Sequence, residues 1–528
     1  MNNNKSPKTS KSPRHKFDTE ICEDNMTFSD CEVAILKNAK EENDNAIGQE
    51  LVNSTEIRKM INIVRDFIID KKLICYGGTA INNILPQNVQ FYDYSVEIPD
   101  FDFYSKDPLN DAINLANIYY AKGFTNVEAK AGMHKGTFKV FVNFIGIADI
   151  THMNKILFDN LMKESIVNEN IHYAPVNFLR MGMYLELSRP KGDTDRWEKV
   201  VKRLNLLNKY YPFSKNDCRQ IDFETASTTT TTTTTSASPL SKANIYVLVR
   251  EELIKEGVVF FGGYARRIYS KYMPKENSRL LNSDPIFDVL SNDHDVLAGN
   301  IKKILEANNI HNIKIEKHEA FGELIPEYSE ISIKGEPLVF IYAPIACHSY
   351  NVVNIGPKLV NIATIETILT FYLTFIYVGK THYNTNRLIC MAKYLFELMQ
   401  KNRLTTTGVL KHFTTTCIGE QETIQSILEH KSKKFEELKK NPNSDEYKQW
   451  FLKYIPGEAK QQPTSTTSPK ATTSPTAPPQ PKAIQQPKMK QMKPQTYAAT
   501  TKRTKRRPSY RRSTSKISRL KKRDDFIV

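Results

Sequence analysis

The sequence of 528 residues lacks the patterns that mark secreted, membrane-spanning or zinc-stabilised proteins. Its seven cysteines form no Cys-x-x-Cys pair and no cluster with histidine, so neither a zinc site nor a disulfide framework is expected, and a reducing compartment fits. The N-terminus has no apolar core of the kind that a signal peptide needs. The most apolar segment, 362–378, is broken by Glu366 and by threonines, so we expect a buried helix and no membrane span.

Net positive charge is scarce in most of the chain, although the chain as a whole carries +16. Residues 458–528 contain 18 Lys or Arg against 3 Asp or Glu, so the rest of the chain is nearly neutral. The tail, rich in Pro, Ser and Thr, cannot fold alone and is predicted to be a flexible polycation. It could hold RNA through its phosphates, or it could serve as a nuclear localisation signal.

Two parts of the sequence share one order of features. A helical period from Thr55 runs into an apolar strand and Gly77-Gly78, and the same order leads to Gly262-Gly263. The continuations YGGTAINNILP and FGGYARRIYSKYMP are alike, and PDFDFYS and NDHDVLA follow, each before another strand-like run. We interpret this as an internal duplication, with a coincidence of apolar runs as the alternative.

Composition then sets the expected domains. They are a disordered segment 1–54, a first domain 55–225, a Thr-rich linker 226–241, a second domain 242–456 and a disordered basic tail 457–528. The length of 528 residues suits two or three domains of ordinary size.

Three carboxylates of the first domain could carry chemistry. Asp100 and Asp102 project from one face of a strand, because side chains alternate along it, while Phe101 and Phe103 enter the core. Two such acids repel each other unless a cation lies between them, and hard oxygen ligands suit Mg²⁺. Asp149 lies in the apolar stretch FIGIADITHM and could be a third ligand, a paired structural acid or a helix cap.

A glycine turn precedes these acids. Gly77 and Gly78 allow the backbone to approach a phosphate chain closely, and Thr79 adds a hydroxyl where a helix is expected to begin. This order of glycine turn, Asp-x-Asp and third acid resembles the polymerase-β-like nucleotidyltransferases. The segments YGGTAINNILP, IPDFDFYS, IADITHM and SRPKGDTDRWEKVVKRLNLLNKYYPF look like the poxvirus-type poly(A) polymerase catalytic subunit, in the form found in large cytoplasmic DNA viruses.

The resemblance covers about residues 55–455 and implies an α+β fold with two tandem nucleotidyltransferase-like domains. It assigns Asp100, Asp102 and Asp149 as catalytic metal ligands and Gly77, Gly78 and Thr79 to the phosphates of ATP. The implied reaction is template-independent addition of AMP from ATP to RNA 3′ ends, by two-metal transfer with Mg²⁺ or Mn²⁺. It further implies a homodimer and a location in the host cytoplasm, in the viral factory, with packaging into the virion as a further option.

Basic residues follow the first copy of the repeated motifs, within the first domain. In a predicted helix 195–207, several lie at spacings of three and four, where they could contact RNA or triphosphate. A solvated face paired with nearby acids is the alternative. The candidate contacts are Arg189, Arg196, Lys199, Lys202 and Arg203.

The second copy has lost part of the motif. Asp293 and Asp295 match Asp-x-Asp, but Tyr264 replaces Thr79, and 338–350 contains no acid. We therefore expect a scaffold that offers a dimer or RNA surface. The competing functions for the whole chain are another template-free nucleotidyltransferase, such as an oligonucleotide synthase, and a catalytically inactive RNA-binding subunit.

Overall fold

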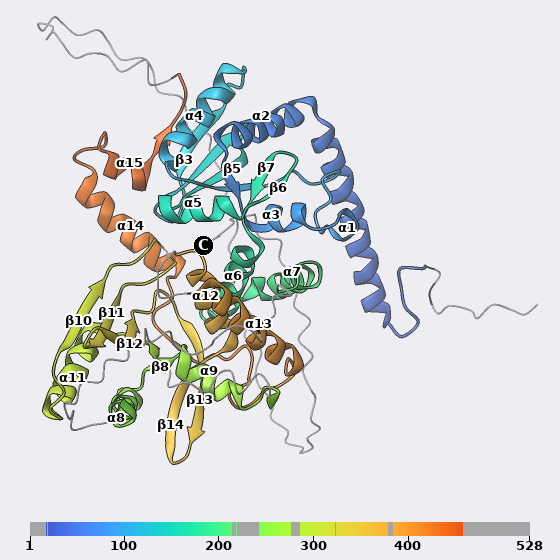
Figure 1. Ribbon diagram of the computed structural model, residues 1–528. Coiled ribbons are helices and arrows are strands. Elements are labelled where there is room, and N and C mark those ends of the chain that lie inside the picture. Colours follow the sequence, from blue (N-terminus) through green and yellow to red (C-terminus); the bar gives the residue numbers. More distant parts are fainter. Residues whose placement is uncertain are drawn as a thin grey trace, which may run out of the picture. The chain divides into compact units, whose positions relative to one another are not determined.

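The computed structural model describes part of the chain and gives a mixed α/β architecture (Figure 1). The described residues are 17, 19–213, 218, 242–275, 286–322, 324–378 and 384–457. The expected linker 226–241 and the basic residues of the tail lie outside them.

The first sheet is built from the first half of the chain and one strand from far beyond it. Its eight strands lie in the order β16-β3-β4-β5-β2-β1-β7-β6. β5 and β7 run parallel to their neighbours β2 and β1, whereas β3, β4 and β16 are antiparallel additions. The strands are β1 (Ile74–Cys75), β2 (Phe101–Ser105), β3 (Val127–Ala131), β4 (Thr137–Val142), β5 (Ile145–His152), β6 (Ile166–Asn168), β7 (Ile171–Tyr173) and β16 (Lys453–Tyr454).

Helices of the first half pack on this sheet or extend from it. In α2 the apolar period predicted from the sequence is confirmed, because Ile57, Met60, Val64, Phe67 and Ile68 are buried. The helices are α1 (Phe28–Asn53), α2 (Thr55–Lys71), α3 (Gly77–Ile84), α4 (Pro108–Ala121), α5 (Lys155–Lys163), α6 (Val176–Leu187) and α7 (Trp197–Tyr210), with short 3₁₀ turns at Gln87–Val89 and Thr194–Arg196.

The second sheet repeats seven strands of the first in the same order, while the eighth strands, β16 and β15, are added at opposite edges. Its order is β10-β11-β12-β9-β8-β14-β13-β15, and β12·β9 and β14·β8 are the parallel pairs, matching β5·β2 and β7·β1. The strands are β8 (Val259–Phe260), β9 (Phe287–Leu290), β10 (Ile313–His318), β11 (Tyr328–Ile333), β12 (Glu336–Tyr342), β13 (His348–Ile355), β14 (Lys358–Ala363) and β15 (Cys417–Ile418). The predicted α+β duplication is confirmed by this topology.

Helices of the second half complete the same plan. They are α8 (Lys242–Lys255), α9 (Gly263–Ser270), α11 (His294–Ala307), α12 (Ile365–Phe375), α13 (Thr385–Lys401), α14 (Ile424–Leu438) and α15 (Asp445–Phe451). α12 packs against α6, and each follows the equivalent strand of its own sheet (Figure 1). The predicted buried helix in 362–378 is confirmed for α12, all of whose residues are buried, whereas Ile362 and Ala363 end β14.

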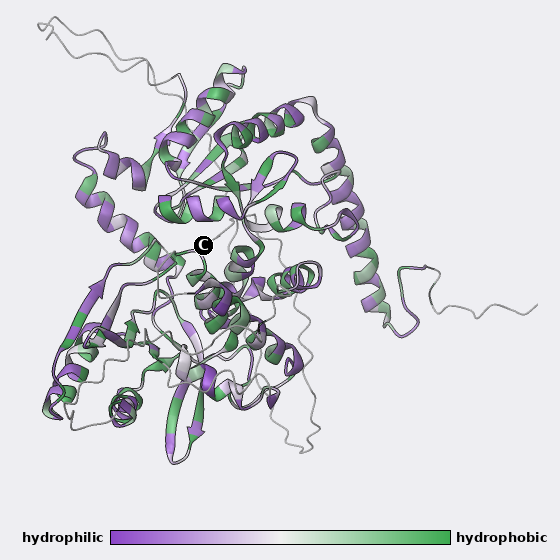
Figure 2. Cartoon of the chain, in the orientation of Figure 1, coloured by the Kyte–Doolittle hydropathy of each residue, from purple (hydrophilic) through white to green (hydrophobic). Residues whose placement is uncertain are grey.

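The N-terminal segment departs from the expected disorder. α1 is a helix of 26 residues, begun by a capping box between Thr27 and Asp30. Its surface is largely hydrophilic (Figure 2), which is why composition alone suggested a segment without structure. α1 gains a tertiary contact at Gly48, where an added Cβ would lie 2.2 Å from the Val96 carbonyl oxygen. Disorder is therefore the wrong expectation for Phe28–Asn53.

The cysteines also depart from expectation. Disulfides join Cys22 to Cys31, Cys218 to Cys390 and Cys347 to Cys417, while Cys75 is a buried thiol. The paired cysteines are 9, 172 and 70 residues apart, respectively, and these separations match no sequence motif that predicts disulfides. The expectation that the chain has no disulfide framework is therefore wrong.

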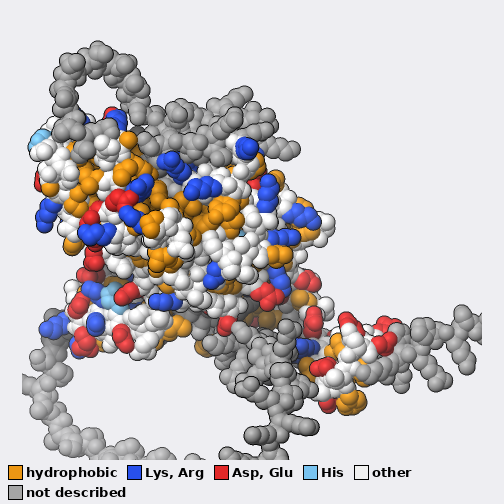
Figure 3. Space-filling view, turned by 90° about the horizontal axis from the view of Figure 1, so that it is seen from below, with side chains coloured by type: hydrophobic (Ala, Val, Ile, Leu, Met, Phe, Trp, Pro, Cys, Tyr) orange, Lys and Arg blue, Asp and Glu red, His pale blue; other side chains and the backbone are white. Residues whose placement is uncertain are grey.

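In the described part of the chain, no helix is both long enough and apolar enough to cross a membrane. Lys and Arg side chains are scattered among hydrophobic ones on the face shown in Figure 3, without forming one continuous basic stripe. This distribution agrees with a nearly neutral body.

Candidate active site

Two neighbouring parallel strands carry the three acids. Asp102 on β2 and Asp149 on β5 are direct partners in the strand register, and Asp100 immediately precedes β2. Alternation along β2 places Asp100 and Asp102 on one face and Phe101 and Phe103 on the other. Asp149 lies within β5, so the helix cap considered for it from the sequence does not apply.

The glycine turn is joined to the strand of acids by hydrogen bonds. The Tyr76 amide donates to the Asp102 carbonyl oxygen at 3.0 Å, and the Thr79 hydroxyl donates to the Asp100 carbonyl oxygen at 2.6 Å. Gly77 has φ +73°, a conformation that L side chains rarely adopt. The turn therefore holds the start of α3 against the acids, and Thr79, 4% exposed, fixes the backbone of Asp100.

A lysine that sequence reasoning missed joins the acids. Lys139 on β4 is the direct partner of Asp149, and its Nζ donates to Asp149 Oδ2 at 2.6 Å. Burial opposes the charge of Lys139, but Asp149, followed by Asp100 and Asp102, raises the pKa of the ammonium above its ordinary value. A signal existed in the strand TFKVFV, where a charged residue alternates with buried apolar ones.

One residue of the predicted basic set reaches the glycine turn. The Arg203 guanidinium donates to the Tyr92 hydroxyl at 2.6 Å and lies over the rings of Phe91 and Tyr92. An added Cβ on Gly78 would lie 2.8 Å from Arg203 Nη1. Burial raises the pKa of Tyr92, Arg203 opposes the shift, and the charges of Asp100 and Asp102 add to it.

The other basic candidates separate into buried and exposed groups. Arg189 is partly buried, and its desolvation lowers its pKa to about 10. Arg196 forms an ion pair with Glu186 at 3.4 Å, and Arg203 and Arg189 also act on that carboxylate. Lys202 forms an exposed i,i+4 pair with Glu198, and Lys199 is exposed on the same helix. Sequence reasoning missed Glu186, a half-buried acid whose charge acts on three of the five cations.

Strand register corrects the predicted counterparts in the second sheet. Phe261 donates its amide to the Asp288 carbonyl oxygen as Tyr76 does to Asp102, so Asp288 is the counterpart of Asp102. The position facing it on β12 is Phe340, where the first sheet has Asp149. Asp293 is instead the N-cap of α11, as Asp107 is of α4. The Asp-x-Asp match at Asp293 and Asp295 was therefore an error of alignment, caused by the recurrence of acids at helix starts.

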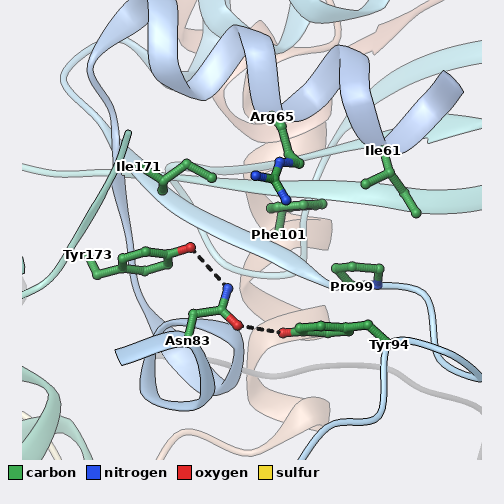
Figure 4. A pocket seen from close by; sticks show the side chains of 8 residues that line it. All are labelled: Ile61, Arg65, Asn83, Tyr94, Pro99, Phe101, Ile171 and Tyr173. Carbon is green, nitrogen blue, oxygen red and sulfur yellow. Dashed lines mark hydrogen bonds between the residues drawn. The ribbon is translucent and has the colours of Figure 1, made fainter. Parts of the chain in front are cut away.

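A cavity of about 210 Å³ lies on the face of β2 opposite the acids (Figure 4). Phe101 forms part of its wall, and Arg65 lies at one side. The Tyr94 hydroxyl donates to Asn83 Oδ1 at 3.1 Å and the Asn83 amide donates to the Tyr173 hydroxyl at 3.0 Å, so these polar groups pair with one another. The cavity is separated from the acids by the strand itself.

One compact group of possible metal ligands lies elsewhere. Among the described residues, the only three such side chains with ligand atoms all within 4.8 Å of one another are Glu316, His318 and Glu330 in the second sheet. His318 is paired with Glu330 at 3.1 Å and Glu316 with Lys314. The three acids of the first sheet are more widely spaced than this group, and Lys139 lies beside them.

Comparisons with known proteins agree with this geometry. Over 87% of the chain, the fold matches 90% of the solved Megavirus polyadenylate synthase, with a TM-score of 0.66 and 19% identity. The likeness shows the fold, which both share. Residues 62–193 match the model of the family described as "Poly(A) polymerase catalytic subunit".

Relatives in two viruses carry the same provisional name, poly(A) polymerase catalytic subunit. That of African swine fever virus (isolate Tick/Malawi/Lil 20-1/1983) is 35% identical over 166 residues, which are 30% of this chain and 34% of the relative. That of Acanthamoeba polyphaga mimivirus is 33% identical over 169 residues, 31% of this chain and 28% of the relative. The matched part spans about a third of these relatives, and the resemblance expected from the sequence is confirmed there.

Proposed function

We propose that the chain is a poly(A) polymerase, which adds AMP from ATP to RNA 3′ ends without a template. The observation that carries this proposal is the meeting of Asp100, Asp102 and Asp149 on neighbouring strands beside the glycine turn. All six of the acids and glycine-turn residues lie within 62–193, the segment that matches the family model.

The donor set suits a hard divalent cation such as Mg²⁺ or Mn²⁺. All three ligands are carboxylates, Asp102 is 4% exposed, and Asp102 and Asp149 are register partners on adjacent strands. When bound, such ions lower the pKa of the RNA 3′ hydroxyl and neutralise charge on the leaving pyrophosphate. Asp100, Asp102 and Asp149 would hold them.

The remaining residues bind and orient the nucleotide in this proposal. The amides of Gly77 and Gly78 begin α3 and would donate to the phosphates of ATP. Arg203 lies beside Gly78 and can exchange its bond to the Tyr92 hydroxyl for a phosphate oxygen. Thr79 serves the site by fixing Asp100. Arg189 and Arg196 act on RNA or triphosphate through the cluster around Glu186, and Lys199 and Lys202 through an exposed face.

Primer extension with each of the four ribonucleoside triphosphates tests the proposal. The wild-type chain should extend an RNA primer with ATP and Mg²⁺ or Mn²⁺, and Asp149→Asn should not. The matched control is Asp159→Asn, which removes one carboxylate from the exposed pair of Lys106 and Asp159. Extension with another nucleotide instead would identify a different template-free nucleotidyltransferase, and RNA binding without any extension would identify an inactive subunit.

Assembly and location follow from the same proposal. A homodimer acting in the host cytoplasm, in the viral factory, is what the resemblance implies, with the virion as a further location. Light scattering of the purified chain measures the first, and fractionation of infected cells the second. The structure contains three disulfides, so the location of the protein also decides whether these bonds stay oxidised.

A further inference from the structure

Lys139 and Asp149 form a half-buried ion pair in the middle of two adjacent strands. The two residues are register partners on β4 and β5, and their side chains are 26% and 15% exposed. The strand register keeps the Lys139 ammonium within reach of the Asp149 carboxylate while the sheet is intact. Its positive charge is thus built into the acid cluster.

The charge acts on all three acids. Lys139 bonds to Asp149 directly and lies within electrostatic reach of Asp100 and Asp102. Three carboxylates in one place repel one another, and a cation among them relieves that repulsion. An ammonium at this position does part of what a divalent ion would do there.

The second sheet supplies an internal comparison. Phe340 takes the place of Asp149, and its register partner on β11 is Glu330, in the place of Lys139. Where the third acid is missing, the lysine is missing too. A lysine needed only to stabilise this kind of sheet would not have to be lost with the acid.

We propose that Lys139 is a positioning residue that serves as the resident counter-ion of Asp149 and competes with the divalent ion for it. The proposal rests on the proposed function, because it takes the three acids as the metal site. Without nucleotide, the lysine keeps the cluster neutral enough to fold and keeps metal binding weak. The negative triphosphate of ATP offsets that charge. The divalent ion therefore binds the protein–ATP complex more tightly than the free protein, and ATP likewise binds the protein–metal complex more tightly.

The test compares Lys139→Met with Lys139→Arg and with Lys71→Met. Lys71 is the matched control, since it pairs with the buried Asp111 at 3.1 Å in the same half of the molecule. Two quantities are measured on the full chain: the melting temperature without metal, and Mn²⁺ affinity by calorimetry with and without ATP. Neither measurement depends on catalytic turnover.

We expect Lys139→Met to melt at a lower temperature without metal and to bind Mn²⁺ about tenfold more tightly than wild type in the absence of ATP. ATP should then improve Mn²⁺ affinity less than it does in wild type. Lys139→Arg should behave like wild type. Lys71→Met should lose stability with no change in Mn²⁺ affinity.

Two results would overturn the proposal in different ways. If Lys139→Met binds Mn²⁺ with wild-type or weaker affinity, and Asp149→Asn abolishes that binding, the lysine is only a structural partner, while the metal site stands. If wild type shows no Mn²⁺ binding that Asp149→Asn removes, the proposed metal site fails and the role of Lys139 fails with it.

Discussion

The two sheets share seven strands in one order, yet equivalent acids, Asp102 and Asp288, have opposite surroundings. On β2, Asp102 faces Asp149 and lies beside a turn whose Gly77 has φ +73°. On β9, Asp288 is partly buried, accepts a hydrogen bond from the Gly263 amide and faces Phe340. An added Cβ on Gly262 would lie 1.8 Å from Asp288 Oδ2, so this glycine turn closes on the protein's own carboxylate.

Under the proposed function, the difference is that between a nucleotide-binding site and a purely structural element. In the second sheet the carboxylate already occupies the amide that a phosphate would need, and Arg266 and Arg387 supply the positive charge. No metal is required to stabilise that acid. In the first sheet the acids are clustered, and their mutual repulsion favours a bound cation. Substitutions in either sheet can test this contrast.

The largest expected effect separates Asp102 from its counterpart. Asp102→Asn should lower primer extension by about 1,000-fold or more, roughly 4 kcal/mol on the barrier, because it removes a ligand of the proposed metal site. Asp288→Asn should keep extension within about twofold of wild type, since only packing changes. Steady-state extension rates at saturating ATP measure both, and comparable losses in the two variants would contradict the contrast.

Removal of 458–528 should give the next largest effect. We expect RNA affinity to fall at least about tenfold at low salt, with a smaller salt slope, because the nearly neutral body retains few phosphate contacts. The extension rate at saturating primer should change much less. Binding and extension of both chains at two salt concentrations measure this, and equal affinity and slope would favour a transport signal.

The stability of the second sheet should depend on pH through Asp288. Burial raises the pKa of Asp288 to about 7, although Arg266 opposes the shift. The unfolded chain has the ordinary pKa of about 3.9, so between these values the folded protein holds a proton that the unfolded chain releases. The stabilisation by that proton is present in acid and is lost as the pH rises to about 7.

Asp288→Asn cannot ionise and should escape this loss. The melting temperature of the variant minus that of wild type should therefore increase between pH 5 and pH 7. A difference of ~1 kcal/mol in unfolding free energy corresponds to a few degrees. Calorimetry across this range is the measurement. A constant difference would mean that Asp288 stays charged in the folded protein.

The smallest effect is expected from Asp293→Asn combined with Asp295→Asn. Asp293 begins α11 without a side-chain cap bond, and Asp295 bonds to Lys317 and Ser329 at the surface. Extension should be unchanged, because neither residue corresponds to Asp100 or Asp102. If the double variant melts normally but loses extension, the second repeat contributes to catalysis.

Periodicity and motif order predicted the larger features of the fold and the site. The apolar stripe of α2, the repeated order of elements and the three acids depend on local patterns, which one sequence displays. The pairing of Lys139 with Asp149 depends on strand register, and the cysteine pairs depend on contacts up to 172 residues apart. Neither leaves a spacing signal. Asp288 was missed because the Asp-x-Asp pattern at Asp293 and Asp295 was matched instead, seven residues beyond the position that the strand register assigns.

The short strand β16 has a consequence for how the protein is made. Lys453 and Tyr454 pair with Lys130 and Ala129, at the edge of the sheet that carries the acids. During synthesis this edge stays open until more than 300 further residues have left the ribosome, and an unpaired edge can recruit other chains. The first sheet is thus begun early and finished last, so a chain truncated between the two repeats would lack a strand of the half that holds the proposed active site.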